Sequence, residues 1–300
     1  MKFELERLSM KNILKNRNTY IVLAIALILL GIGYYFSTPK LVEIMMKDVI
    51  TQVDNNNLVL AKEKFEQAKF LNAFVAREYA KQLCDVGIRK NEEGNYNSVQ
   101  EIISFVEQLS PAKDTEFSKK LIVQGKAKMK AGLYDKAITY FDIAIIFDPS
   151  IADVYLQKGK AILKENKNCE GIFNCDYSEV IKLMNNAIDL DNNLAEAYVY
   201  RGIAYHNTSD TVEMQTKSLE DFNKAITLNS NKEATAIAYC FTAIAKFNEQ
   251  DLNGFTNDRN IAMKLKREVG NITEYPKAFE HVNTAEHMMC ALYDRCEFIH

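Results

Sequence analysis

The side chains with the clearest capacity for chemistry are six cysteines, whose thiols can form disulfide bonds or bind metals. Cys169 and Cys175 lie close together in the polar segment NKNCEGIFNCD. A disulfide bond between these two is one expectation, although six cysteines allow many pairings and sequence alone does not choose among them. Cys84 and Cys240 lie in apolar helical segments, where a free cysteine acts as a small buried hydrophobe. We expect no chemistry from those two.

A second group of potential ligands, His281, His287, Cys290, Cys296 and His300, lies near the C-terminus. His287 and Cys290 are three positions apart and would share one helical face, as two ligands of a tetrahedral zinc ion require. However, the group lacks a paired C-x-x-C, and a helix would have to break between Cys290 and Cys296. We therefore expect a disulfide bond or free thiols here and no metal, with a metal-dependent enzyme as the less favoured alternative.

No catalytic motif accompanies these residues. The sequence contains no G-x-S-x-G, no GxxxxGK[ST] and no H-E-x-x-H, so a serine hydrolase, a phosphate-binding loop and a zinc peptidase all lack support. The formal net charge of −3 provides no overall basic field for nucleic acid. We expect no enzymatic activity, no cofactor and no nucleic-acid partner.

The elements that position these side chains are expected to be helices. Only 11 glycines and 4 prolines occur in 300 residues, which leaves few breakers for a protein of many short strands and turns. Hydrophobic residues make up 48% and charged residues 26%, a balance typical of a chain that folds. The predicted class is all-α.

One long uncharged run, Tyr20 to Phe36 (YIVLAIALILLGIGYYF), predicts a single N-terminal transmembrane helix. A cleaved signal peptide and a buried core helix are the alternatives, but the run ends without a small-residue cleavage site. Five Lys or Arg residues precede the run, whereas Lys40 and Lys47 are the nearest that follow it. This bias predicts residues 1–19 in the cytoplasm and the C-terminal body outside it, periplasmic or extracellular.

Beyond the anchor, one pattern of apolar and small residues recurs six times, with the first copies about 38 residues apart. Two clear copies are Tyr96, Val99, Ile103, Val106 and Tyr134, Ala137, Phe141, Ala144. Their spacing is that of one face of a helix. A further helical segment precedes each copy and carries a compact residue where two helices would approach closely. These residues are Val49, Gly87, Gly125, Gly159, Gly202 and Ala243.

This pattern resembles the tetratricopeptide repeat (TPR) family. The best match is Leu121, Gly125, Gly132, Tyr134, Ala137, Phe141, Ala144 and Pro149, which reproduces the family's spacing almost throughout but lacks its early Trp. The resemblance implies a right-handed superhelical solenoid of stacked helix-turn-helix units over residues 41–274, with a concave and a convex side. The expected units are 42–75, 80–113, 118–151, 152–194, 195–232 and 236–269, followed by a capping helix at 275–300.

In this family the first helices line the concave face, which implies a candidate protein-binding surface. Lys126 and Lys160 occupy equivalent positions in adjacent units, as do Lys130 and Lys164, so four ammonium groups are expected in two rows. Simple solvation of an exposed face is the alternative, and the Asn residues of the carboxylate clamp known in relatives are absent. The remaining expected surface residues are Lys119, Ile122, Leu156 and Tyr200.

Like charges at this spacing repel each other and destabilise the helices slightly, and an acidic ligand would offset that repulsion. The sequence therefore predicts a membrane-anchored scaffold or adaptor that binds an acidic segment of a protein or peptide, in envelope assembly, secretion or a similar complex. A receptor of inverted topology, with its repeats in the cytosol, is the alternative.

Overall fold

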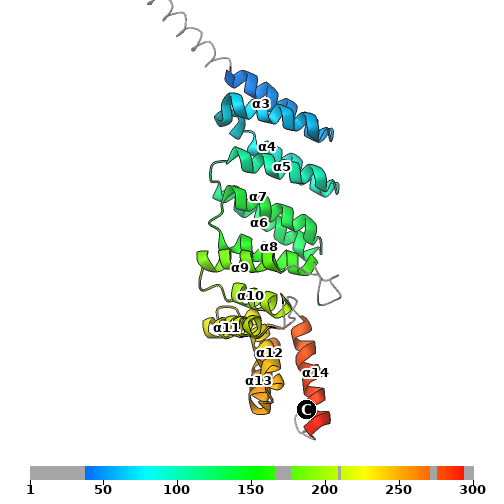
Figure 1. The fold of residues 1–300 in the computed structure, drawn as a ribbon, viewed down its shortest axis with the longest axis vertical. Coiled ribbons are helices and arrows are strands. Elements are labelled where there is room, and N and C mark those ends of the chain that lie inside the picture. Colours follow the sequence, from blue (N-terminus) through cyan, green and yellow to red (C-terminus); the bar gives the residue numbers. More distant parts are fainter. Residues whose placement is uncertain (1–37, 166–176, 209–210, 271–275, 294–300) are drawn as a thin grey trace, which may run out of the picture. The chain divides into compact units, whose positions relative to one another are not determined.

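The computed structural model describes residues 38–165, 177–208, 211–270 and 276–293 (Figure 1). Every regular element in these ranges is an α-helix, and the helices pack in adjacent pairs, which confirms the predicted class. None of these helices is both long and apolar enough to cross a membrane. The expected anchor, Tyr20 to Phe36, and the expected disulfide between Cys169 and Cys175 lie outside the described residues.

The chain divides into two compact units, Met1–Ala112 and Lys113–His300. In the first unit, a helix of residues 38–54 precedes α3 (Leu58–Arg77), α4 (Ala80–Glu92) and α5 (Tyr96–Leu109).

The second unit contains four successive helix pairs and a final helix. Within each pair the two helices contact each other, and consecutive pairs pack together. These helices are α6 (Thr115–Lys130), α7 (Tyr134–Phe147), α8 (Ala152–Glu165), α9 (Ser178–Leu190), α10 (Ala195–Thr208), α11 (Val212–Leu228), α12 (Lys232–Asn248), α13 (Leu252–Val269) and α14 (Pro276–Tyr293).

Short polar side chains fix where several helices begin. Asn95, Asp114, Thr211, Asn231 and Asp251 each accept a hydrogen bond from the backbone N–H three positions later. Such a bond satisfies one of the unpaired N–H groups of the first turn. The cap at Asp114 starts α6 three residues before the unit boundary expected from the repeat pattern.

Close approach of the two helices within a pair explains why the spacing of glycine and large apolar residues recurs along this chain. A Cβ atom at Gly125 would lie 2.5 Å from Cε1 of Phe141, and one at Gly202 would lie 2.9 Å from Cε1 of Phe222. Each glycine of a first helix therefore makes room for a large side chain of the second. Two further contacts of this kind join Gly87 to Ile102 and Gly159 to Met184.

The turns inside two pairs depend on glycine for a different reason. Gly94 and Gly132 adopt φ angles of 78° and 75°, a left-handed backbone conformation that residues with a Cβ atom rarely adopt. The chain therefore reverses within a few residues at the expected positions. Val49 and Ala243, the other compact residues of the pattern, are fully buried.

The last helix, α14, packs against α12. Its buried face includes Phe279 and Val282, and Lys266 of α13 places its ammonium 4.6 Å from the centre of the Phe279 ring. Arg259 of α13 also pairs with Glu286. The described part of α14 thus covers the final helix pair at the place where the sequence predicts a cap.

Candidate functional site

The strongest candidate site is a pocket of about 540 Å³ in the second unit. It is lined by α6, by the first residue of α7 and by α8. None of the described side chains that line it is acidic. Its lining residues are Lys126, Met129, Lys130, Tyr134, Gln157, Lys160 and Lys164. The structure therefore brings all four lysines of the two expected rows to one cavity.

Lys126 is already paired inside the protein. Its Nζ lies 2.7 Å from Oδ2 of Asp153, and both side chains are about two-fifths exposed. The Gln157 side-chain nitrogen donates a hydrogen bond of 3.0 Å to Oδ1 of the same aspartate. Asp153 thus holds two of the polar groups that line the pocket.

The two rows of lysines expected from the sequence suggest solvated side chains, but Lys160 is only 5% exposed. The adjoining α10 covers it: Nζ lies 3.3 Å from Oε1 of Glu196 and 5.3 Å from the centre of the Tyr200 ring. An ion pair and an aromatic face together compensate for removing this ammonium from water. Lys160 joins two repeats at the floor of the pocket.

The other predicted residues divide between the pocket and the core. Lys130 is exposed and Lys164 is partly buried, and both line the pocket. Lys119 is exposed on α6 but does not line it. The apolar residues expected beside the lysines, namely Ile122, Leu156 and Tyr200, are buried between helices. Because they are buried, these three residues pack the helices together and do not form an exposed binding surface.

Sequence reasoning missed Met129, Tyr134 and Gln157 as pocket residues. Gln157 precedes Lys160 by three positions and Lys164 by seven, so the helical period alone could have placed it on the lysine face. Tyr134 entered the prediction only as a member of the repeat pattern. Asp153 precedes Gln157 by four positions, so the same period places it on this face of α8. Its contact with Lys126 could not be predicted in this way, because it depends on how neighbouring helices pack. The same holds for the contact of Glu196 with Lys160.

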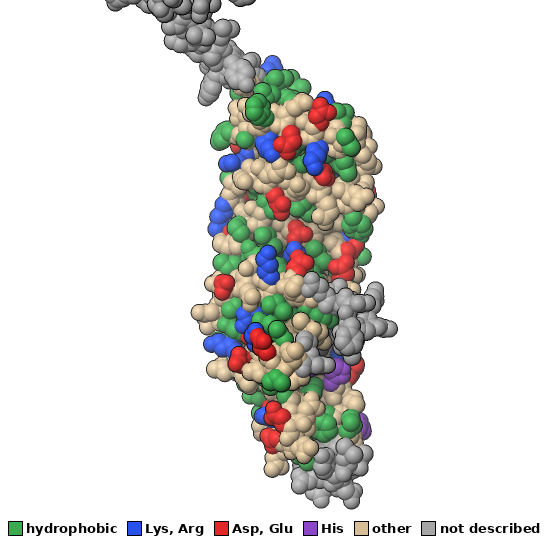
Figure 2. Space-filling view, in the orientation of Figure 1, with side chains coloured by type: hydrophobic (Ala, Val, Ile, Leu, Met, Phe, Trp, Pro, Cys, Tyr) green, Lys and Arg blue, Asp and Glu red, His purple; other side chains and the backbone are tan. Residues whose placement is uncertain are grey.

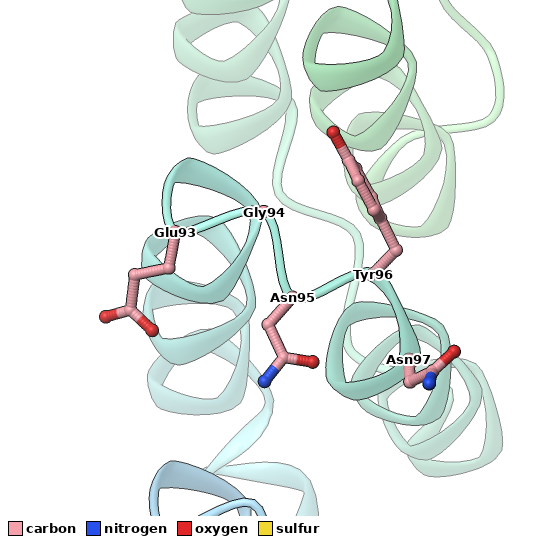
Figure 3. Close-up of a pocket in the computed structure, with 5 residues that line it drawn as sticks. All are labelled: Glu93, Gly94, Asn95, Tyr96 and Asn97. Atoms are coloured by element: carbon pink, nitrogen blue, oxygen red, sulfur yellow. The ribbon is translucent and has the colours of Figure 1, made fainter.

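A second pocket, of about 380 Å³, lies at the turn between α4 and α5 in the first unit. It is lined by residues 93–97, and Figure 3 shows the side chains of Glu93, Asn95, Tyr96 and Asn97 pointing in different directions. Asn95 is engaged as the helix cap, since its side chain accepts from Ser98 N–H. These residues do not converge on a common ligand position.

Cys84 and Cys240 are fully buried and free, as expected of small core residues. Burial raises the pKa of the Cys84 thiol to about 12 and also raises that of Cys240. Both therefore stay protonated and unreactive at neutral pH.

In the C-terminal cluster, His281 and His287 are exposed on α14. Nδ1 of His287 lies 2.8 Å from the Asn283 carbonyl oxygen. Within the described ranges, no three His, Cys, Asp or Glu side chains gather as metal ligands would. The Cys290 side chain, Cys296 and His300 lie outside them.

Comparison with known proteins gives structural likeness only. No protein-family model matches the sequence, and no curated protein matches it. The first TPR of Spaghetti (RPAP3), bound to the HSP90 peptide SRMEEVD, is 22% identical, with 41% of this chain and 88% of that chain covered and a TM-score of 0.35. The Arabidopsis OM64 TPR domain is 23% identical, with 40% and 90% covered and a TM-score of 0.34.

A third solved structure, MamA, is 20% identical, with 68% of this chain and 96% of that chain covered and a TM-score of 0.32. The assignment of this fold rests on the chain's own geometry: adjacent helix pairs, a glycine of the first helix against a large side chain of the second in four pairs, and left-handed glycines in two of the turns. Together these contacts identify the described part of the chain as an array of tetratricopeptide-type repeats.

Proposed function

We propose that this protein is a membrane-anchored, non-catalytic adaptor that binds an acidic segment of a partner protein in the lysine pocket. One observation carries the proposal: four lysines from two adjacent first helices line a single pocket whose described lining residues include no acidic side chain. Two of the four already have acidic partners beside the pocket, Asp153 and Glu196, so a ligand carboxylate competes with these. Such a cavity attracts carboxylates, since charge-assisted hydrogen bonds are stronger than neutral ones.

The other lining groups suit a peptide. The Tyr134 hydroxyl and the Gln157 amide offer directional hydrogen bonds, and Met129 offers an adaptable apolar contact. A volume of about 540 Å³ accommodates a few side chains. Because Lys130 is exposed, part of the attraction is screened by ions, and binding should weaken as salt concentration rises.

The binding test uses full-length protein in detergent and a fluorescein-labelled hexaglutamate peptide as the probe. Changing Lys126, Lys130 and Lys164 together to Glu should lower affinity at least about tenfold, a loss of about 1.4 kcal/mol. Lys160 is left unchanged because its burial would confound folding with binding. The matched control changes Lys120, Lys182 and Lys224, which are exposed and do not line the pocket, to Glu. Equal binding by both triple variants would refute the proposed site.

The anchored topology is supported by the apolar run Tyr20 to Phe36 and by the excess of Lys and Arg before it. On this basis we place the repeats outside the cytoplasm, where the adaptor would serve envelope assembly or secretion. Reporter enzymes fused after His300 should be active only when exported. Activity of a cytoplasmic reporter at the same position would instead favour the receptor of inverted topology.

A further inference from the structure

Several large apolar side chains of the first unit are exposed to solvent, and four of them lie near one end of its first helical hairpin. Phe70 and Phe74 on α3 are 90% and 72% exposed, and Leu41 and Ile44 on the helix of residues 38–54 are 47% and 58% exposed. Buried residues elsewhere on the same helices, such as Val49 and Phe65, already form the core, and Phe65 stacks on Phe105 of α5. Exposed large apolar residues that lie close together are unusual on a soluble surface and indicate an interaction site.

These four residues lie at one end of a helical hairpin. The helix of residues 38–54 and α3 run antiparallel and are joined by the turn at 55–57 (Figure 1), and Lys64 of α3 pairs with Asp48 of its neighbour. The start of the first helix therefore lies beside the end of α3. Hydrophobic side chains are visible at this end of the first unit in Figure 2.

The backbone of α3 bends within this end. Asn72 leaves the helical conformation, with φ −161° and ψ 92°, and its side-chain oxygen accepts a hydrogen bond from Val75 N–H. This cap starts a new turn after the bend. Phe70 and Phe74 thus lie on either side of a break that Asn72 itself stabilises.

The position of this end in the chain indicates what covers it. The described part of the helix that carries Leu41 and Ile44 starts at residue 38, two positions after the apolar run Tyr20 to Phe36 in the sequence. If that run spans the bilayer, the hairpin end is held within a few ångströms of the membrane surface. The nearest apolar medium for the four side chains is then the lipid.

We propose that Phe70, Phe74, Leu41 and Ile44 dock into the boundary between lipid headgroups and acyl chains and so fix the repeats against the membrane. This inference rests on the anchored topology proposed above. Two ion pairs lie nearby, Lys47 with Glu43 at 2.7 Å and Lys69 with Glu66 at 3.0 Å, and Lys40 beside Leu41 is exposed. Docking should therefore be mainly hydrophobic, with Lys40 as the cation placed nearest to the lipid headgroups.

The test exploits the absence of tryptophan from the natural sequence. Phe70→Trp, Phe74→Trp and Val59→Trp are introduced one at a time into the full-length chain, which is reconstituted into phosphatidylcholine vesicles that contain acyl-brominated lipid. Val59 is the control because it is 85% exposed but lies near the opposite end of α3, about 20 Å from Phe74 at 1.5 Å per residue.

Bromine quenching of Phe70→Trp and Phe74→Trp fluorescence should exceed that of Val59→Trp at least about threefold, because interfacial helices bury their apolar face by only about 5–10 Å. Equal quenching of all three variants would overturn the inference. Emission that is blue-shifted without quenching would assign the patch to a second protein surface and would also overturn it.

The same experiment separates this inference from the proposed function. If the chain does not float with the vesicles, both the anchored topology and the docking are refuted. Hexaglutamate binding is measured separately, in detergent and at a pocket in the second unit. Loss of lipid quenching with retained peptide binding would therefore refute the docking surface alone.

Discussion

The ammonium of Lys126 in α6 lies 2.7 Å from the carboxylate of Asp153 in α8, so one cation of the lysine pocket is already bound to a carboxylate of the next helix pair. Gln157 donates to the same carboxylate. In effect, Asp153 occupies part of the position that an acidic ligand requires. A ligand carboxylate must displace it or share Lys126 with it, and either event reduces the affinity that the pocket could otherwise reach.

Asp153→Asn should therefore tighten binding of the hexaglutamate peptide. Removing the negative charge releases Lys126, and an exposed ion pair of this kind contributes up to about 1 kcal/mol, which corresponds to about fivefold in affinity. Fluorescence anisotropy titrations at low salt measure the change. The control is Asp189→Asn, the same charge change at an exposed position on α9. An equal gain in both variants would show that only overall charge matters.

Lys160→Glu should destabilise the fold, whereas Lys130→Glu should not. Lys160 is buried against Glu196 and Tyr200, so reversing its charge would place two carboxylates side by side in a poorly hydrated position. We expect a loss on the order of 2 kcal/mol in the free energy of unfolding. Lys130 is exposed, and its reversal should change stability by less than about 0.5 kcal/mol. Equal urea midpoints for the two variants would contradict the burial of Lys160.

The residues that sequence reasoning placed correctly are those governed by contacts inside one helix pair. Gly125 against Phe141 is such a contact, and it repeats with a fixed spacing, so its periodicity is visible in the sequence. The convergence of the four lysines followed from the same register, since equivalent positions of neighbouring units lie side by side.

The burial of Lys160 could not be predicted from the repeat periodicity. It depends on how closely α10 approaches α8, and the sequence between them is longer than the repeat length, with an insertion at about residues 165–176. A periodic pattern shows which face of α8 carries the lysine, but not that Glu196 and Tyr200 cover it. The same limit applies to Asp153, whose partner Lys126 belongs to a different pair.

The exposed aromatic residues of α3 were also missed, for a local reason. The repeat pattern assigns Ala61, Phe65 and Ala68 to the core, and the structure buries all three. Beyond Ala68 the pattern makes no assignment, and the bend at Asn72 changes the direction of the last turn. An asparagine inside a helix signals such a break only weakly, because most asparagines there simply face solvent.

Gly125→Leu should destabilise the protein by about 1–3 kcal/mol, the usual cost of overpacking a core. A side chain at this position would collide with the Phe141 ring, which is fully buried and cannot move aside freely. Thermal and urea unfolding measure the loss. The matched control is Gln124→Leu, which adds a leucine at the neighbouring exposed position of the same helix. Adding Phe141→Ala to the Gly125→Leu variant should restore part of the lost stability. If it does not, the destabilisation does not come from the collision with Phe141.

Asp148 should make the fold sensitive to acid. This carboxylate is 1% exposed at the end of α7; burial by itself would raise its pKa. Hydrogen bonds from the Ser150 and Thr115 hydroxyls, each 2.6 Å long, and an ion pair of 3.0 Å with Lys113 outweigh that effect. They hold the pKa of Asp148 well below its ordinary value of 3.8.

Because the folded state lowers this pKa, the carboxylate stabilises the fold fully above the ordinary value, and that contribution is lost as pH falls below about 4. Asp148→Asn removes the charge and should cost about 1–2 kcal/mol near neutral pH. Comparing the unfolding free energies of the two proteins between about pH 7 and pH 3 isolates this group from other carboxylates. The difference should shrink toward the acid end; a difference that stays constant with pH would mean that the charge of Asp148 contributes nothing to the fold.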